Sequence, residues 1–174
     1  MRILSLDIST VSTGWCTFDA SQGIRSGTLS IKESIDIHHR MIIFKDKLNN
    51  LLSDYMPTDI VIEDVWFGKN PKTAKILSKF CGIAEETATR FLNKAPITIE
   101  NTKVKSFFKC SKKADLFQFL ISLLGANFQN LSFNKDNDSI DAIAQLIFYL
   151  DSIDYVKVRS QKNYGYLYDI EGII

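Results

Sequence analysis

The pattern of hydrophobic and polar positions predicts three strands within the first 31 residues. Residues 2–8 form an almost continuous apolar run, which is typical of a buried strand. Residues 13–19 and 24–31 have the pattern of two more strands, and Gly23 and Gly27 lie near the turns. Because no helical pattern separates these strands, we expect them to pair as an antiparallel meander.

The period changes to that of a helix from residue 36 onwards. Apolar residues recur at intervals of four and three from Ile37 to Tyr55, which predicts an amphipathic helix that ends before Pro57. A short β-branched strand, TDIVIED, follows, and Asn70 and Pro71 mark the start of a long helix. The remaining elements that the pattern predicts are a fifth strand in PITIE and helices at about 102–109, 113–124 and 138–153.

The long helix predicted at about 70–93 has a wide apolar face made of two adjacent arcs. The first arc holds Ala74, Leu77, Cys81, Ala84 and Ala88, and the second holds Ile76, Phe80, Ile83 and Phe91. Lysines at 72, 75 and 79 occupy the other side. A face this wide indicates burial against two surfaces, which we expect to be the sheet and a second subunit.

The order of these elements predicts an α/β fold with one mixed five-stranded sheet. Three antiparallel strands come first, βαβ units then extend the sheet, and helices cover both faces. A chain of 174 residues, 45% of them hydrophobic, suits one domain with a sizeable core. We expect that domain to cover residues 1–155, followed by a tail at 156–174 whose structure the pattern does not define.

The charge of the chain is concentrated in its middle. The net charge is only +1, but residues 63–113 hold eleven basic and five acidic side chains, a local excess of +6. A polyanion-binding surface needs such an excess, although a solvated lysine face has the same composition. No apolar run approaches the ~18 residues of a membrane-spanning helix, and the N-terminus does not have the pattern of a signal peptide. We therefore expect a cytoplasmic protein that does not bind membranes.

Four acids from three distant parts of the chain lie at strand ends and at a helix start, and an acid in a central strand is costly unless it is paired. Asp7 lies in the apolar first strand, Glu63 ends the fourth, and Asp138 and Asp141 open the last helix. Asp138 alone is explained as an N-cap, but if the helix begins near it, both aspartates share a face with Gln145. Clustered carboxylates bind hard cations such as Mg²⁺, two of them about 4 Å apart for phosphoryl chemistry. Any single strand-end acid is more often a turn or cap residue, and it is the combination that favours a metal site.

Three segments of the sequence resemble the RuvC-type Holliday-junction resolvases, which have an RNase H-like fold. They are ILSLDISTVSTGW, IVIEDVWFGKNPKTAKILSKFCGIA and DSIDAIAQ, and the likeness covers about residues 2–150. The resemblance implies that Asp7, Glu63, Asp138 and Asp141 are the catalytic acids and bind two Mg²⁺ ions, for which Mn²⁺ can substitute. One ion would activate the attacking water, and the other would stabilise the leaving 3′ oxygen.

The same resemblance assigns DNA contacts to residues around the acids. Trp66 matches an aromatic residue that contacts bases near the strand crossover, and stacking on an unpaired base is worth about 1–3 kcal/mol. A core tryptophan under the loop is the competing interpretation. Each basic residue alone is more often a solvated surface charge, but as a group they offer phosphates a basic track. The other residues that match the family's DNA contacts are Lys69, Asn70, Lys105 and Lys113, with Lys103 as a neighbouring candidate.

The sequence departs from the bacterial resolvases in two places. Ile8-Ser9 stands where they have Pro-Gly after the first aspartate, although Thr13-Gly14 is retained. The tail, from residue 156, has no counterpart that aligns with them.

The resemblance implies a homodimeric, Mg²⁺-dependent, structure-selective endonuclease. It would nick two strands of like polarity at a Holliday junction or another branched DNA, leaving 5′-phosphate and 3′-hydroxyl ends. One alternative is a catalytically inert protein that binds branched DNA on the same fold. A less favoured alternative is a nucleotide-binding protein of the actin-like superfamily. The segment LSLDISTVSTGW resembles the first phosphate loop of that superfamily, but its fold normally needs about twice this length.

Overall fold

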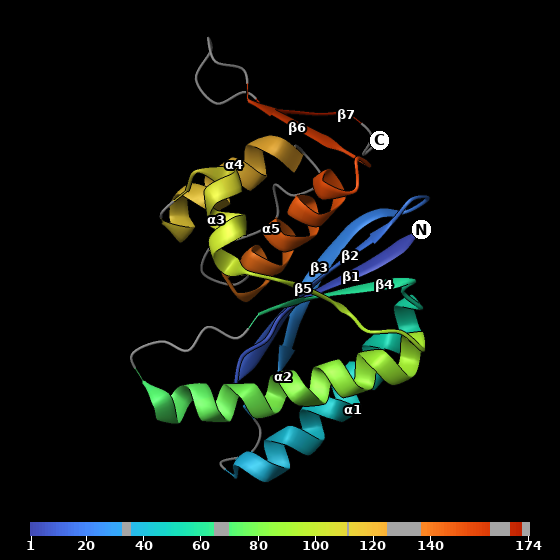
Figure 1. The fold of residues 1–174 in the computed structure, drawn as a ribbon, viewed down its shortest axis with the longest axis vertical. Helices are drawn as coiled ribbons and strands as arrows, with labels where there is room; N and C mark the ends of the chain where they lie inside the picture. The colour runs from blue at the N-terminus through green and yellow to red at the C-terminus, as the bar shows by residue number, and fades with distance from the viewer. Residues whose placement is uncertain (33–35, 65–69, 111, 125–136, 161–167, 172–174) are drawn as a thin grey trace.

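The computed structural model describes residues 1–32, 36–64, 70–110, 112–124, 137–160 and 168–171. Its main sheet has five strands in the order β3-β2-β1-β4-β5 (Figure 1). The three N-terminal strands pair antiparallel, and β4 and β5 continue the sheet parallel to β1. The bounds are β1 Arg2–Asp7, β2 Ser12–Asp19, β3 Gly23–Ser30, β4 Asp59–Glu63 and β5 Ile97–Ile99. The predicted mixed sheet, with its meander followed by parallel strands, is confirmed.

Helices cover both faces of this sheet, as Figure 1 shows. The bounds of the pair on one face are α1 Ile37–Tyr55 and α2 Pro71–Leu92. Those on the other face are α3 Asn101–Phe108, α4 Lys113–Leu124 and α5 Asn137–Ser152. The helix α5 crosses the sheet and contacts β1, β2, β3 and β4. It is therefore the helix of its layer that packs across the central strands.

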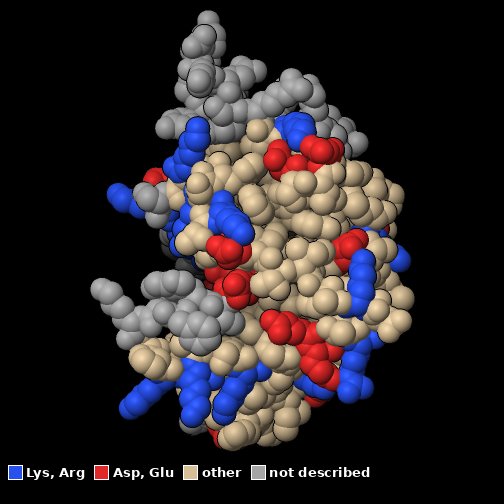
Figure 2. Space-filling view, viewed as in Figure 1, with Lys and Arg blue, Asp and Glu red and all other residues tan. Residues whose placement is uncertain are grey.

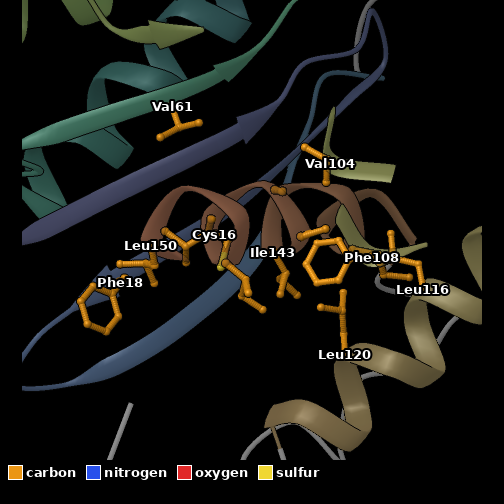
Figure 3. Packing of buried hydrophobic residues seen from close by; sticks show 14 of the residues in the cluster. Cys16, Phe18, Val61, Val104, Phe108, Leu116, Leu120, Ile143 and Leu150 are labelled. Carbon is orange, nitrogen blue, oxygen red and sulfur yellow. The ribbon is translucent and has the colours of Figure 1, made fainter. Parts of the chain in front are cut away.

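The alternation of side chains along the strands produces two hydrophobic cores. On β1, Leu4 and Leu6 face α1 and α2, whereas Ile3 faces the opposite layer. In the α1–α2 core, the rings of Phe44 and Phe80 meet edge to face with centroids 5.5 Å apart. In the other core, residues of α5 pack between the sheet and the aromatic side chains of α3 and α4 (Figure 3). Both faces of the central strands are consequently buried.

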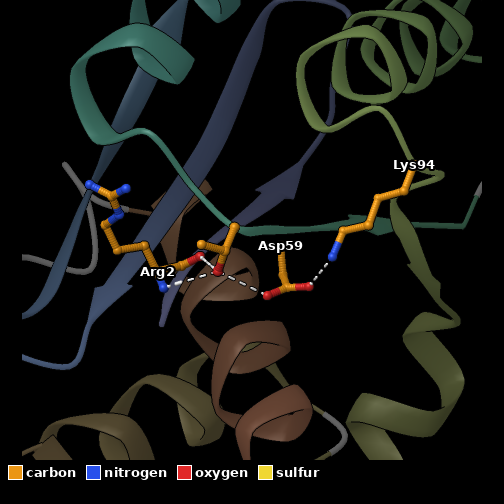
Figure 4. A network of polar contacts seen from close by, with 4 residues as sticks. Arg2, Asp59 and Lys94 are labelled. Atoms are coloured by element: carbon orange, nitrogen blue, oxygen red, sulfur yellow. Dashed lines mark hydrogen bonds and ion pairs between the residues drawn. The ribbon is translucent and has the colours of Figure 1, made fainter.

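A polar network holds the starts of β1 and β4 together (Figure 4). The Thr58 hydroxyl accepts a hydrogen bond from the Arg2 N–H at 3.2 Å and lies 2.8 Å from the Arg2 carbonyl oxygen. The neighbouring Asp59 carboxylate forms an ion pair with Lys94 at 2.8 Å. These contacts support the register in which Leu6 lies beside Ile62, so that Asp7 and Glu63 follow next to each other at the far ends.

The long helix α2 begins as its sequence predicts. The Asn70 side chain accepts hydrogen bonds from the Lys72 and Thr73 N–H groups, and Pro71 is the first helical residue. The first apolar arc is largely buried, but Ile76 of the second arc is 36% exposed. The sheet and α1 therefore leave only part of the second apolar arc of α2 exposed.

The segment predicted as a tail contains a second, two-stranded sheet. The strands β6 (Lys157–Ser160) and β7 (Tyr168–Glu171) pair antiparallel. Val156, just before β6, is buried, and Val158 packs against the core under α5. None of the helices within the described ranges is both long enough and apolar enough to span a bilayer.

We predict that Phe80→Ala lowers the free energy of unfolding by about 3–5 kcal/mol, because it removes a fully buried ring and leaves a cavity beside Phe44. The matched control is Ile42→Ala on α1, where the side chain is 60% exposed and the change should stay within about 0.5 kcal/mol. Urea unfolding followed by circular dichroism measures both. Equal effects of the two substitutions would contradict the assigned core.

Candidate active site

Two carboxyl groups meet where β1 and β4 end. Asp7 and Glu63 are both partly buried, and a hydrogen bond joins their side chains. The pKa of Asp7 is raised well above its ordinary value, first because burial removes water and next because Glu63 and Asp141 carry like charges nearby. Lys113 acts in the opposite direction on the same group.

Amide side chains bind both oxygens of Glu63. The Asn101 amide, at the start of α3, donates to Oε1. The Gln145 amide of α5 donates to Oε2 at 3.1 Å, and the Ser5 hydroxyl lies 3.3 Å from the Gln145 oxygen. Gln145 shares the predicted face of the two aspartates, but the sequence pattern alone indicates no role for it and does not single out Asn101. A polar residue directly after the fifth strand, whose end lies beside Glu63, was the available signal.

The start of α5 is pressed against β2 at Gly14. A Cβ built on Gly14 would lie 1.7 Å from the carbonyl oxygen of Asp138, so only glycine allows this approach. Gly14 is also the register partner of Asp7, which brings the backbone of Asp138 over the end of β1. The helix begins at Asn137, so Asp138 lies in its first turn rather than at the N-cap position. Its charge there still suits the positive end of the helix dipole.

Lys113 is the basic residue that reaches the acids. Its Nζ forms an ion pair with Asp141 Oδ2 at 2.6 Å, and the side chains are 31% and 24% exposed. Lys103 instead pairs on the surface with Glu100 at 2.8 Å. Lys105 is exposed in the last turn of α3, four residues after Asn101 and therefore on the same side of that helix.

The comparison with protein families identifies this arrangement. The model of the family described as crossover junction endodeoxyribonuclease RuvC matches residues 3–147, which include all four predicted acids. The chain belongs to the RuvC family. It is accordingly an endodeoxyribonuclease of the type that resolves Holliday junctions.

Individual RuvC relatives agree with that assignment. The RuvC protein of Borrelia turicatae is 25% identical over 155 residues, which cover 84% of this chain and 94% of the relative. The RuvC protein of the Wolbachia of Brugia malayi is 30% identical over 87 residues, but the match spans only 47% of this chain and 54% of the relative.

Solved structures support the fold. Thermus thermophilus RuvC, solved in complex with a Holliday junction substrate, has a TM-score of 0.69 at 12% identity and covers 87% of this chain and 96% of its own. The fowlpox virus Holliday junction resolvase has a TM-score of 0.52 at 18% identity, covering 88% and 99%. At these identities the likeness is one of architecture, and it matches the predicted RNase H-like sheet.

The residues of the site fit the metal dependence of RuvC nucleases. The candidate ligands are carboxylates, the donors that Mg²⁺ and Mn²⁺ prefer. Burial and the like charges of Glu63 and Asp141 raise the pKa of Asp7, and a cation would offset both effects, as the Lys113 ammonium beside Asp141 does in part. Within the described ranges, no three His, Cys, Asp or Glu side chains are grouped closely enough to hold a metal ion as they stand. Asp141 is engaged by Lys113, and Glu63 by its two amides.

The structure describes some, but not all, of the remaining residues that are predicted to contact DNA. Asn70 caps α2 and therefore has a structural role as well. Trp66 and Lys69 lie outside the described residues. Blue side chains gather at the lower left of Figure 2, over the first part of α2, where the exposed lysines are Lys72, Lys75 and Lys79. The predicted basic side of this helix is confirmed as a surface feature.

We predict that Gly14→Ala destabilises the protein by about 1–3 kcal/mol and displaces the start of α5, because the new methyl group overlaps the Asp138 carbonyl. Gly82→Ala on α2 is the matched control. A methyl group there meets nothing within 4 Å, and alanine should stabilise the helix by about 0.5–1 kcal/mol. Thermal unfolding measures both, and a neutral Gly14→Ala would refute the close approach.

Proposed function

We propose that this chain is a Mg²⁺-dependent endonuclease that resolves four-way DNA junctions by paired nicks. The observation that supports the proposal is the side-by-side placement of Asp7 and Glu63 at the ends of β1 and β4, with Asp141 near enough to raise the pKa of Asp7, in a member of the RuvC family. The Thermus relative was solved with a Holliday junction, which supports the same substrate class here. The products would be 5′-phosphate and 3′-hydroxyl ends.

Asp7, Glu63, Asp138 and Asp141 are the residues that would hold the metal. When bound, two Mg²⁺ ions would lower the pKa of the attacking water and neutralise charge at the leaving 3′ oxygen. Metal binding would favour the ionised form of Asp7, because the positive charge would offset the burial and the neighbouring carboxylates that raise its pKa. Lys113 would contact the scissile phosphate, which competes with Asp141 for its ammonium group.

The surface around the acids suits a branched polyanion. Lys105 is exposed on the side of α3 that carries Asn101, which binds Glu63, and the exposed lysines of α2 add further positive charge for phosphates. We assign Trp66 and Lys69 to the same interface, with the indole stacking on an unpaired base at the crossover. Contacts to phosphates would orient the junction, and stacking on the unpaired base would allow the protein to recognise the branch point.

We predict that Asp141→Asn lowers the rate of junction cleavage by more than about 100-fold, while junction binding persists. A residue that only supports a metal ligand typically costs up to roughly 100-fold when it is lost, and a ligand itself should cost more. The control is Asp46→Asn, an exposed aspartate of α1, which should leave the rate unchanged. Labelled four-way junction, fork and linear duplex are incubated with Mg²⁺ and with chelator.

Three results would count against the proposal in different ways. Equal cleavage of linear duplex would leave a nuclease without branch selectivity. Junction binding without cleavage by the wild type would indicate an inert binding protein. Full activity in chelator would exclude the dependence on metal.

We further propose that two copies act together, since two symmetric nicks need two sites. The incompletely covered side of α2 around Ile76 offers an apolar surface for the contact. Light scattering is therefore expected to give twice the chain mass of 19.8 kDa, and Ile76→Asp should shift that mass toward the monomer. A monomer at micromolar concentration, with paired nicking intact, would contradict this arrangement.

A further inference from the structure

Glu63 is held by two neutral donors that come from separate elements. Asn101 Nδ2 binds one carboxylate oxygen, and Gln145 Nε2 binds the other at 3.1 Å. Asn101 is placed there because β5 pairs with β4 at Glu63–Ile99 and α3 begins two residues later. Gln145 is placed there by the packing of α5 across the central strands. Each oxygen of a carboxylate has two acceptor sites, so a single amide leaves a second site open on each.

The orientation of the Gln145 amide is fixed by Ser5, which contacts its oxygen on the side away from Glu63. The residue is 2% exposed, and Ser5 of β1, which lies 3.3 Å from Gln145 Oε1, is fully buried. A carboxylate can only accept hydrogen bonds, so the amide must present its NH₂ group to Glu63 and its oxygen to the Ser5 hydroxyl. Burial of an amide is costly unless both ends are bonded, and this relay satisfies both. Ser5 therefore acts on Glu63 through Gln145.

Neutral donors have an effect on Glu63 that a cationic side chain would not have. They stabilise the negative charge of this carboxylate beside Asp7 without placing a positive charge where a metal ion must come. Lys113, by contrast, neutralises Asp141 and must be displaced from it. The amides thus hold the Glu63 carboxylate in place without adding positive charge beside it.

We propose that Asn101 and Gln145, the latter supported by Ser5, are positioning residues that orient Glu63 for metal binding. This inference rests on the proposed function, in which Glu63 is a metal ligand. Residues that support a ligand in this way typically change metal affinity by 10–100-fold when they are lost. We therefore expect Gln145→Met, which keeps the length of the side chain and removes its donor, to weaken Mn²⁺ binding by about 10-fold or more.

The test measures metal binding without DNA, by calorimetric titration of Mn²⁺ into the full chain, and then cleavage as a function of metal concentration. Gln145→Met should raise the half-saturating concentration in both, with the maximal rate largely recovered at saturating metal. Gln118→Met is the matched control, because Gln118 is exposed on α4 and lines a different surface. It should leave both constants unchanged.

The relay makes a second, sharper prediction. Ser5→Ala should weaken Mn²⁺ binding less than Gln145→Met does, and the double variant should be no worse than Gln145→Met alone, since Ser5 acts only through that amide. Asn101→Ala, at a partly exposed position, tests the other donor if Gln145→Met does not fold. Unchanged Mn²⁺ affinity in the folded variants, or additive effects of Ser5→Ala and Gln145→Met, would overturn the inference.

These outcomes are separable from those of the proposed function. A wild-type chain that binds Mn²⁺ but cuts no junction would refute the nuclease proposal, while the titrations would still decide the role of the amides. An active wild type whose metal affinity does not depend on Gln145 or Asn101 would refute only the positioning role. A chain that binds no Mn²⁺ would overturn both.

Discussion

The parallel pairing of β1 with β4 is the constraint on which the rest of the site depends. Their register makes Asp7 and Glu63 neighbours at the strand ends, in a sheet whose two faces are covered by helices. Two unit charges about 4 Å apart repel by roughly 4 kcal/mol at an effective dielectric constant of ~20, so this placement is costly when both groups are ionised. The polar network of Arg2, Thr58 and Asp59 at the opposite ends of the strands helps to keep the register, although it lies at the other end of β4 from Glu63. The repulsion is therefore a consequence of the fold itself, and neighbouring side chains have to offset it.

Different partners offset this charge at different acids. Lys113 offsets part of the effect that raises the pKa of Asp7, and its ammonium group is paired with Asp141. Glu63 receives hydrogen bonds from two amides, which carry no net charge. The ammonium group places a positive charge beside Asp141, whereas the amides add none beside Glu63. This division of roles is a property of α3, α4 and α5, because each of these helices contributes one of the partners.

Close packing determines how α5 delivers its residues. Gly14 removes the side chain that would otherwise separate β2 from the first turn of the helix, and Asp138 and Ser139 occupy that space. The buried alanines Ala142 and Ala144 belong to the same layer, where α5 meets the sheet. A glycine one strand away from Asp7 therefore affects the site through the position of a helix and not through its own chemistry.

The sequence by itself determined most of the architecture and the identity of the acids. Apolar positions that recur every two residues, or every three to four, were enough to predict the strands of the main sheet and the helices, together with Asn70-Pro71 at a helix start. These patterns are visible in the sequence because each element buries one of its faces. They did not reveal the hairpin of β6 and β7. Asp7 and Glu63 stood out since an acid in an apolar strand is costly without a partner. Only the tertiary structure decided which partners those acids have. Asn101, Lys113 and Gln145 are ordinary surface or helix residues by local pattern, and Asp138 resembled a cap until the helix was seen to begin at Asn137. Their roles depend on the pairing of β4 with β5 and on the packing of α5 over Gly14, contacts between segments far apart in the chain that no local period encodes.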